Sequence, residues 1–243
     1  MAKVALITGG SRGIGAATAR KLASEGYLIG LNYIKNKVAA TQLSDELNKD
    51  RKRCVLLQGD VSQESDVLRI FEELDETFGP LTHLVNNAAI LQPQTKLVDM
   101  DANRINRVLS TNVTSAFLCC REAVKRMVNG GAIVNVSSAA ARIGAPHEYI
   151  DYAASKAAVD TLTKGLALEV ADRGIRVNGV RPGFIYTDMH ADGGEPGRVD
   201  RMKENIPLKR GGQPEEIAAA IAWLLSDDAS YVTGSILDAA GGR

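Results

Sequence analysis

Cysteine is scarce in this sequence, which contains only three cysteines in 243 residues. Cys54, Cys119 and Cys120 have neither the spacing of a disulfide framework nor that of a zinc site. We interpret the adjacent Cys119 and Cys120 as packing residues of a helix rather than a redox pair. The three histidines have no ligand spacing either, so we predict that the protein holds no metal. Free thiols without a disulfide pattern indicate the cytoplasm as the expected compartment.

Net charge is absent as well, because 29 Lys and Arg residues balance 29 Asp and Glu residues. A neutral chain lacks the electrostatic footprint of nucleic-acid binding, so we predict no nucleic-acid partner. Long hydrophobic runs are also missing, since the longest one near the end, Ile217 to Leu225, is too short to span a bilayer. The first predicted strand begins by residue 3 or 4, so we expect no signal peptide and no membrane partner.

What the chain does contain is a repeated alternation of short apolar runs and longer helical patterns. Hydrophobic residues make up 45% of the sequence, and we expect one domain over residues 1–243. The alternation predicts an α/β fold with a doubly wound parallel sheet of about seven strands and helices on both faces. The predicted strands are Val4–Ile7, Leu28–Leu31, Cys54–Leu57, Leu84–Val85, Ala132–Val136, Arg176–Val180 and Ser235–Leu237. Ligands of such sheets bind beyond the carboxyl ends of the strands.

A glycine-rich turn follows the first predicted strand and opens a helix. Gly9 and Gly13 provide turn geometry and close backbone approach, and Gly15 allows the helix to pack tightly on the strand. The helix start offers free N–H groups and a partial positive charge to an anion. Strand, turn and helix together predict a site for the pyrophosphate of a dinucleotide, although a glycine triplet alone also fits an ordinary tight turn.

The end of the second predicted strand indicates which dinucleotide is bound. A site for NAD usually has Asp or Glu about 20 residues beyond the glycine turn, but this chain has Asn32 and no acid before Asp45. Arg12 lies inside the turn, and Lys35 and Lys37 follow the strand. Positive charge without a carboxylate favours a 2′-phosphate, so we predict NADP(H) over NAD(H). The two lysines alternatively begin a solvated helix.

Polar residues also follow the third and fourth predicted strands. Asp60 fits a turn aspartate, and Ser62 is positioned to cap the next helix. Asn86 and Asn87 can tie neighbouring strand ends together. Ala89 would be strained if its position required a positive φ.

Tyr152 and Lys156 lie four residues apart, on one face of a predicted helix. An unperturbed tyrosine has a pKa of about 10, and a cation one turn away is expected to lower that pKa. Tyr152 could then exchange a proton with the oxygen of an alcohol or a carbonyl. Ser138, at the end of the fifth strand, could hydrogen-bond the same oxygen. Ser137 is its neighbour on the opposite face of the strand.

Asn112 lies in the middle of a predicted helix from Arg104 to Met127, where asparagine is mildly disfavoured. One interpretation is a buried amide that is satisfied by backbone groups. The other is a functional asparagine in a kinked helix, and both can hold together.

These motifs together resemble the short-chain dehydrogenase/reductase family over nearly the whole chain, from Thr8 to Gly242. The resemblance rests on Thr8-Gly9-x-x-x-Gly13-x-Gly15, Asn86-Asn87-Ala88 (with Ala89 where the family has glycine), Ser110-Thr111-Asn112-Val113, Tyr152-x-x-x-Lys156 and Pro182-Gly183. It implies a Rossmann fold and a catalytic set of Asn112, Ser138, Tyr152 and Lys156. The residues assigned to the cofactor are Gly9, Ser11, Arg12, Gly13, Ile14, Gly15, Asn32, Tyr33, Asp60, Val61, Asn87, Ala88, Tyr152, Lys156, Pro182, Gly183, Ile185 and Thr187.

The resemblance also implies an activity and an assembly. We expect an NADP(H)-dependent oxidoreductase that interconverts a secondary alcohol and a carbonyl, in a homotetramer. The subgroup resembles bacterial glucose-dehydrogenase-like and 3-oxoacyl-reductase-like members. The alternatives are an NAD(H)-using sugar or polyol dehydrogenase and a cofactor-sensing protein with little turnover. Residues 189–212 are expected to cover the substrate, with a short helix near 199–204, and His147 to Asp151 to form the opposite wall.

Overall fold

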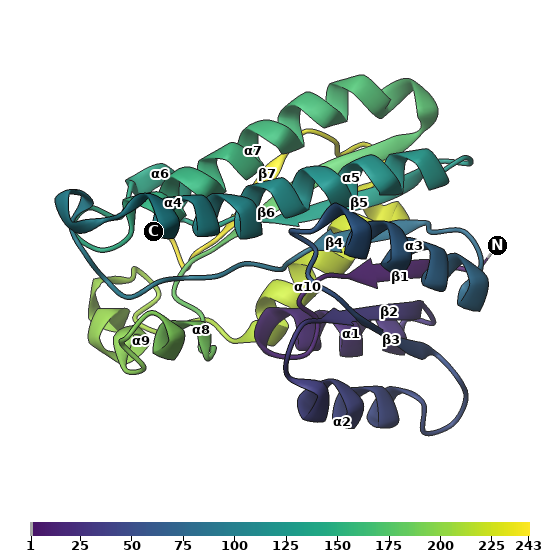
Figure 1. The fold of residues 1–243 in the computed structure, drawn as a ribbon, viewed down its shortest axis with the longest axis horizontal. Coiled ribbons are helices and arrows are strands. Elements are labelled where there is room, and N and C mark those ends of the chain that lie inside the picture. The colour runs from purple at the N-terminus through teal and green to yellow at the C-terminus, as the bar shows by residue number, and fades with distance from the viewer. Residues whose placement is uncertain (1) are drawn as a thin grey trace.

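A computed structural model of the protein describes residues 2–243, and its centre is one seven-stranded parallel sheet (Figure 1). The strand order is β3-β2-β1-β4-β5-β6-β7. This topology confirms the predicted doubly wound α/β fold, with a strand at each of the seven predicted places. The strands are β1 Val4–Ile7, β2 Leu28–Tyr33, β3 Cys54–Gln58, β4 His83–Asn86, β5 Gly131–Val136, β6 Ile175–Pro182 and β7 Ile236–Ala239.

Two layers of helices enclose the sheet (Figure 1). One layer consists of α1 (Gly13–Ser24), α2 (Lys37–Leu47) and α10 (Pro214–Leu225), and the other of α3 (Glu64–Phe78), α5 (Ser115–Arg126) and α7 (Ile150–Val170). Alternation along β1 supplies both cores, because Ala5 and Ile7 belong to the first and Val4 and Leu6 to the second. No helix among residues 2–243 is long and apolar enough to cross a membrane.

The predicted helix over Arg104 to Met127 is interrupted by a π-helical turn. It consists of α4 (Ala102–Leu109), the π turn Ser110–Thr114 and α5. A π turn widens the helix by one residue and often occurs at functional sites. The capping prediction for Ser62 is wrong, because α3 has Gln63 at its N-cap position and Ser62 instead donates its backbone N–H to Asp60 Oδ1 at 2.9 Å.

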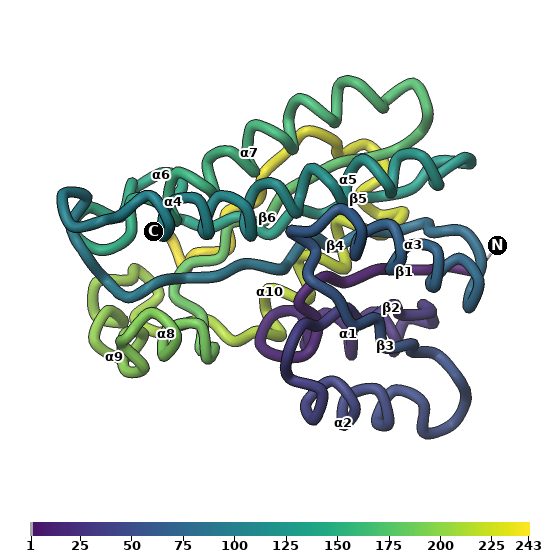
Figure 2. The backbone as a smooth tube through the Cα atoms, in the orientation of Figure 1, coloured from purple at the N-terminus to yellow at the C-terminus, as the bar shows by residue number. Residues whose placement is uncertain are grey.

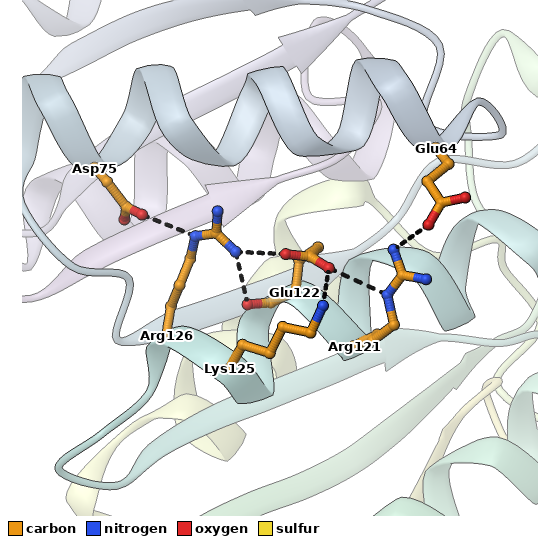
Figure 3. A network of polar contacts seen from close by, with 6 residues as sticks. All are labelled: Glu64, Asp75, Arg121, Glu122, Lys125 and Arg126. Carbon is orange, nitrogen blue, oxygen red and sulfur yellow. Dashed lines mark hydrogen bonds and ion pairs between the residues drawn. The ribbon is translucent and has the colours of Figure 1, made fainter.

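A buried carboxylate joins α3 and α5 (Figure 3). The Glu122 side chain is only 3% exposed, yet both of its oxygens accept hydrogen bonds from cationic side chains. Burial disfavours the charged carboxylate, but these hydrogen bonds outweigh it and lower the pKa of Glu122. The network comprises Glu64, Asp75, Arg121, Glu122, Lys125 and Arg126.

The segment after β6 folds over the carboxyl ends of the strands, as expected for a cover. It contains α8 (Met189–Asp192), α9 (Arg198–Met202) and a 3₁₀ turn (Lys203–Asn205), so a helix does form near residues 199–204. It lies beside the connection from β4 to α4 (Figure 2), where Gln94 Nε2 donates to Glu195 Oε2 at 2.7 Å. The short helix α6 (Ala140–Ile143) follows β5 and lies across these strand ends from α8 and α9 (Figure 1).

Candidate active site

The predicted site residues all lie at or beyond the carboxyl ends of strands, or on a helix that packs there. Gly9 to Gly15 link β1 to α1, Asn32 and Tyr33 end β2, and Asp60 and Val61 follow β3. Asn87 and Ala88 follow β4, Ser138 follows β5, and Pro182 to Thr187 end and follow β6. Tyr152 and Lys156 lie on α7, and Asn112 lies on the π turn. The topology therefore brings residues from six strand ends to one edge of the sheet.

The glycine turn has the geometry that close approach to a ligand requires. Gly9 has a φ of +60° and Gly13 a φ of +52°, a backbone conformation that residues other than glycine rarely adopt. A Cβ on Gly15 would lie 2.6 Å from the Gly9 carbonyl oxygen, so only glycine fits where α1 meets the turn. The first N–H groups of α1 have no partner within the helix and are free to bind an anion.

Thr8 and Asn87 lock the glycine turn to the end of β4. The Thr8 hydroxyl accepts from the backbone N–H groups of Asn87 and Ala88 at 3.0 Å each. Asn87 Nδ2 donates in return to the carbonyl oxygens of Thr8 and Gly9. The amide that we predicted to tie strand ends together therefore does so. Ala89 has no positive φ, so it carries none of the strain considered from the sequence.

Asn32 is buried at 1% exposure, and its amide is used by the backbone. Its Nδ2 donates to the carbonyl oxygens of Leu57 and Gly59, and its Oδ1 accepts from the Gly9 N–H. The side chain therefore holds the glycine turn against β2 and β3 and has no donor left for a ribose. Asp60 likewise supports its own loop, accepting from the Ser62 N–H, and Val61 is buried.

Arg12 lies half-exposed at the mouth of the site and forms an ion pair with Asp192 of α8. It lines a hollow beside α1 together with Ser11, Gly13 and Thr187. Lys35 and Lys37 are exposed, and Lys37 is the first residue of α2. Lys37 therefore begins a solvated helix, as the alternative interpretation predicts, and the role of both lysines toward a 2′-phosphate stays a prediction.

Ser138, Tyr152 and Lys156 converge on one cavity. Ser138 lies beside the Tyr152 phenol, and the Lys156 ammonium lies 5.8 Å from the centre of the Tyr152 ring. The ammonium donates to the Val136 carbonyl oxygen at 2.7 Å. Ser137 turns away and donates to the Lys156 carbonyl oxygen at 3.2 Å. The two serines therefore differ as strand alternation predicts, and Ser138 is the one beside the phenol.

Burial controls the protonation of this group. Burial raises the pKa of Tyr152 to about 12, opposed by the hydrogen bond from Ser138. Burial also lowers the pKa of Lys156 to about 8, opposed by the charge of Asp160. The expectation that the nearby Lys156 cation brings the pKa of Tyr152 below its ordinary value is therefore wrong for the chain's own groups. With the chain's own groups alone, Tyr152 is a protonated acid at neutral pH.

Asn112 is buried and fully engaged. Its Oδ1 accepts from the Ile90 N–H at 2.8 Å, and its Nδ2 donates to the Ile90 carbonyl and to Ser155 Oγ. Ser155 Oγ donates onward to the Tyr152 carbonyl at 2.7 Å. The amide is thus satisfied mainly by backbone, as one interpretation predicted, and it fixes the β4–α4 connection beside α7.

The cavity around Tyr152 has a volume of about 160 Å³. Glu148 and Tyr149 line it as expected, whereas His147 is exposed and Asp151 pairs with Arg104 outside it. Met189 and His190 of the covering segment also line it. Arg198 and Met202, from the segment 189–212 that was expected to cover the substrate, line the cavity as well. Leu91, Phe184 and Arg243 are wall residues that were not predicted, and no sequence signal marks Arg243.

Comparison with known proteins gives relatives over the full length of this chain. A family model described as Enoyl-(Acyl carrier protein) reductase matches residues 9–243. The chain is 61% identical over 245 residues to "Uncharacterized oxidoreductase YgfF" of Escherichia coli K12, covering 99% of each protein. It is 39% identical over 244 residues to 3-oxoacyl-[acyl-carrier-protein] reductase FabG of Staphylococcus aureus, covering 100% of this chain and 98% of that protein.

Solved structures agree with this relationship. A short-chain dehydrogenase from Burkholderia cenocepacia in complex with NADP is 32% identical, with a TM-score of 0.93 over 99% of this chain and 97% of that one. A blue fluorescent protein from a metagenomic library, in complex with NADPH, is 36% identical, with a TM-score of 0.91 over the same shares. The chain belongs to the short-chain dehydrogenase/reductase family of oxidoreductases.

Proposed function

We propose that the protein is an NADP(H)-dependent oxidoreductase that interconverts a secondary alcohol and a carbonyl, with Tyr152 as the general acid and base. The observation that carries this proposal is the convergence of Ser138, Tyr152 and Lys156 on one cavity, with Ile14 and Thr187 in its wall. Ile14 belongs to the glycine turn, so the catalytic group and the dinucleotide site share a boundary. The enclosed wall keeps water away from the reacting atoms.

Each side chain has a distinct task in carbonyl reduction. NADPH, when bound, would supply the hydride for the carbonyl carbon. The Ser138 hydroxyl donates a hydrogen bond to the carbonyl oxygen and holds it beside the Tyr152 phenol. Tyr152, protonated because its pKa is about 12, gives its proton to that oxygen as negative charge develops there. In alcohol oxidation Tyr152 accepts the proton instead.

Lys156 and Asn112 support Tyr152 in this proposal. The Lys156 ammonium stabilises the phenolate that remains after proton transfer, because opposite charges attract strongly where water is excluded. Its bond to the Val136 carbonyl ties the ammonium to the end of β5. Asn112 acts through Ser155, which holds the Tyr152 carbonyl, so Asn112 is a positioning residue.

The preference for NADP(H) over NAD(H) rests on charge. The glycine turn contributes Arg12, and β2 ends without a carboxylate, so the Arg12 guanidinium is available to a 2′-phosphate and no acid of β2 opposes it. The NADP and NADPH in the two related structures support this cofactor. Asp192 is a competitor for Arg12, so we expect the phosphate to replace the carboxylate as the partner of the guanidinium.

Two substrate classes compete for this proposed activity, a 3-oxoacyl thioester and a sugar or polyol. An acyl carrier protein would need a basic surface near the site. The nearby cations are already paired, Arg201 with Glu195, Lys203 with Asp200 and Arg210 with Glu216. This pairing favours a small free substrate. The single domain over residues 1–243 and the cytoplasmic location remain proposals from composition, and the homotetramer remains a proposal from the resemblance.

The substitution Tyr152→Phe tests the proposed reaction. It removes the acidic proton but keeps the ring, so we expect NADPH oxidation with short ketones, 3-oxoacyl thioesters and sugar-derived carbonyls to fall by about 10²–10⁴-fold. NADPH binding, followed by calorimetry, should stay within a few-fold of the unmodified protein. Undiminished turnover in this variant would contradict the role of Tyr152. Tight NADPH binding without turnover of any carbonyl by the unmodified protein would favour a cofactor sensor.

A further inference from the structure

Three nitrogen-bearing side chains surround the Phe184 ring in the wall of the catalytic cavity. The Cζ atoms of Arg198 and Arg243 lie 5.3 and 4.9 Å from the ring centre, and the His190 ring is stacked at 6.5 Å. All four residues line the same cavity as Tyr152. The chain therefore gathers cationic and polar groups at the place where a substrate must lie.

Each of these three side chains has a buried nitrogen without a hydrogen-bond partner among the described residues. The atoms are Arg198 Nη1, Arg243 Nη1 and His190 Nδ1. Arg198 as a whole is only 6% exposed. A buried polar atom that lacks a partner costs free energy, so such atoms are rare unless a ligand uses them. The nearest carboxylate to Arg198 Nη1 is Glu195 Oε2, at 3.7 Å, beyond hydrogen-bond distance.

The cations of this cluster exceed its carboxylates. Glu148 accepts from Arg198 Nη2 at 2.6 Å, and Glu195 is bound by Arg201 through both oxygens. Arg243 forms no ion pair with any side-chain carboxylate among residues 2–243. Lys156 adds another cation to the same cavity. Arg198 and Arg243 therefore each retain an N–H donor without a partner, and the Arg243 guanidinium has no side-chain carboxylate beside it among residues 2–243.

We propose that the substrate is a small oxo acid or hydroxy acid whose carboxylate is bound by Arg198 and Arg243. This inference rests on the proposed oxidoreductase activity and names the substrate class for that same site. Guanidinium groups match carboxylates in both charge and geometry. The cation–π contacts of Arg198 with Tyr149 and Phe184 hold its guanidinium in place before the substrate arrives.

His190 refines the chemistry of this substrate. Its Nε2 lies 3.0 Å from the Ile185 carbonyl oxygen, so Nε2 carries the hydrogen and donates. Burial lowers the pKa of His190, which leaves the ring neutral and Nδ1 a hydrogen-bond acceptor. An acceptor beside two arginines complements a hydroxyl next to a carboxylate. Hydroxylated oxo acids should therefore bind better than their deoxy counterparts.

The test compares each acid with its own methyl ester. We would measure binding of 3-, 4- and 5-oxo acids and their methyl esters to the NADPH-loaded protein by calorimetry, and the kcat/KM of each pair. The expected result is that at least one acid binds and reacts tenfold or more better than its ester. Arg243→Gln should remove that preference mainly through KM, and Arg243→Lys should restore part of it. Arg210→Gln, an exposed change outside the cavity, is the matched control and should leave the preference intact.

The outcomes separate this inference from the proposed function. Esters that bind and react as well as their acids would overturn the carboxylate site while leaving the oxidoreductase activity in place. An acid preference that survives in Arg243→Gln would overturn it as well. If no carbonyl turned over, the proposed activity would fail, and the binding comparison would still decide whether carboxylates are preferred.

Discussion

Two charged clusters in this protein each contain a buried charged side chain, Glu122 in one and Arg198 in the other, but they differ in how their atoms are paired. Between α3 and α5, both oxygens of Glu122 accept hydrogen bonds from neighbouring cations (Figure 3). Around Phe184, three side-chain nitrogens have no partner among the described residues. Even the first cluster has one such atom, Asp75 Oδ1, but its central carboxylate is satisfied. Burial alone therefore does not separate the two clusters, whereas the pairing of their buried atoms does.

The contrast has an energetic meaning. A buried charge is tolerated when its partners replace the water that it has lost, as they do for Glu122. The Phe184 cluster keeps its donors unpaired in the protein alone, which costs stability and leaves them ready for a ligand. Proteins commonly trade stability for function at such sites.

The largest expected effect comes from removing Glu122, the central carboxylate of the cluster between α3 and α5. Glu122→Ala leaves its partner cations without their central carboxylate, and we expect a loss of about 3 kcal/mol in the free energy of unfolding. Glu64→Ala is the control, because Glu64 forms one exposed pair with Arg121, and we expect about 1 kcal/mol or less. Urea denaturation measures both. Equal effects would contradict the difference that we draw between buried and exposed members.

A smaller effect is expected from pH on kcat/KM, through the charge of Lys156 in the cavity around Tyr152. The pKa of Lys156 is lowered to about 8, so its charge is present below pH 8 and lost as the pH rises through that value. Tyr152, with a pKa of about 12, stays protonated over this range. The kcat/KM for carbonyl reduction should therefore be level below pH 8 and fall above it, by up to about tenfold per pH unit. A level profile from pH 7 to 10 would argue against a charged Lys156 in the reaction.

The smallest expected effect is on the free energy of unfolding when the cluster around Phe184 is changed. Arg243→Gln removes a guanidinium that has an unpaired nitrogen, so we expect the free energy of unfolding to change by less than about 1 kcal/mol. The same urea titration used for Glu122→Ala measures this. A loss as large as that of Glu122→Ala would mean that Arg243 is a structural residue, and that the two clusters do not differ as described.

The sequence predicted well those features that depend on local signals. All seven strands occur where apolar runs were found. The glycines of the turn, and the pair Tyr152 and Lys156, are also close together in the sequence, so their spacing could be recognised there. The family model and the related proteins confirm the identification that these motifs suggested.

Other features depend on packing between distant segments and had no local signal. Phe184, Arg198 and Arg243 meet only because the segment after β6 and the end of the chain fold over one cavity. The raised pKa of Tyr152 follows from burial, which the spacing to Lys156 does not reveal. The ion pair of Arg12 with Asp192 joins residues that are 180 positions apart.

The central claim, hydride transfer coupled to a proton from Tyr152, is tested most directly with isotopically labelled cofactor. NADPH deuterated at both positions of nicotinamide C4 would be incubated with the best carbonyl from the acid and ester panel, and the alcohol analysed by mass spectrometry and NMR. The account predicts one deuterium on the carbinol carbon for each NADPH consumed, and little product with Tyr152→Phe. Consumption of NADPH without deuterium in the product, or equal product formation by Tyr152→Phe, would contradict it.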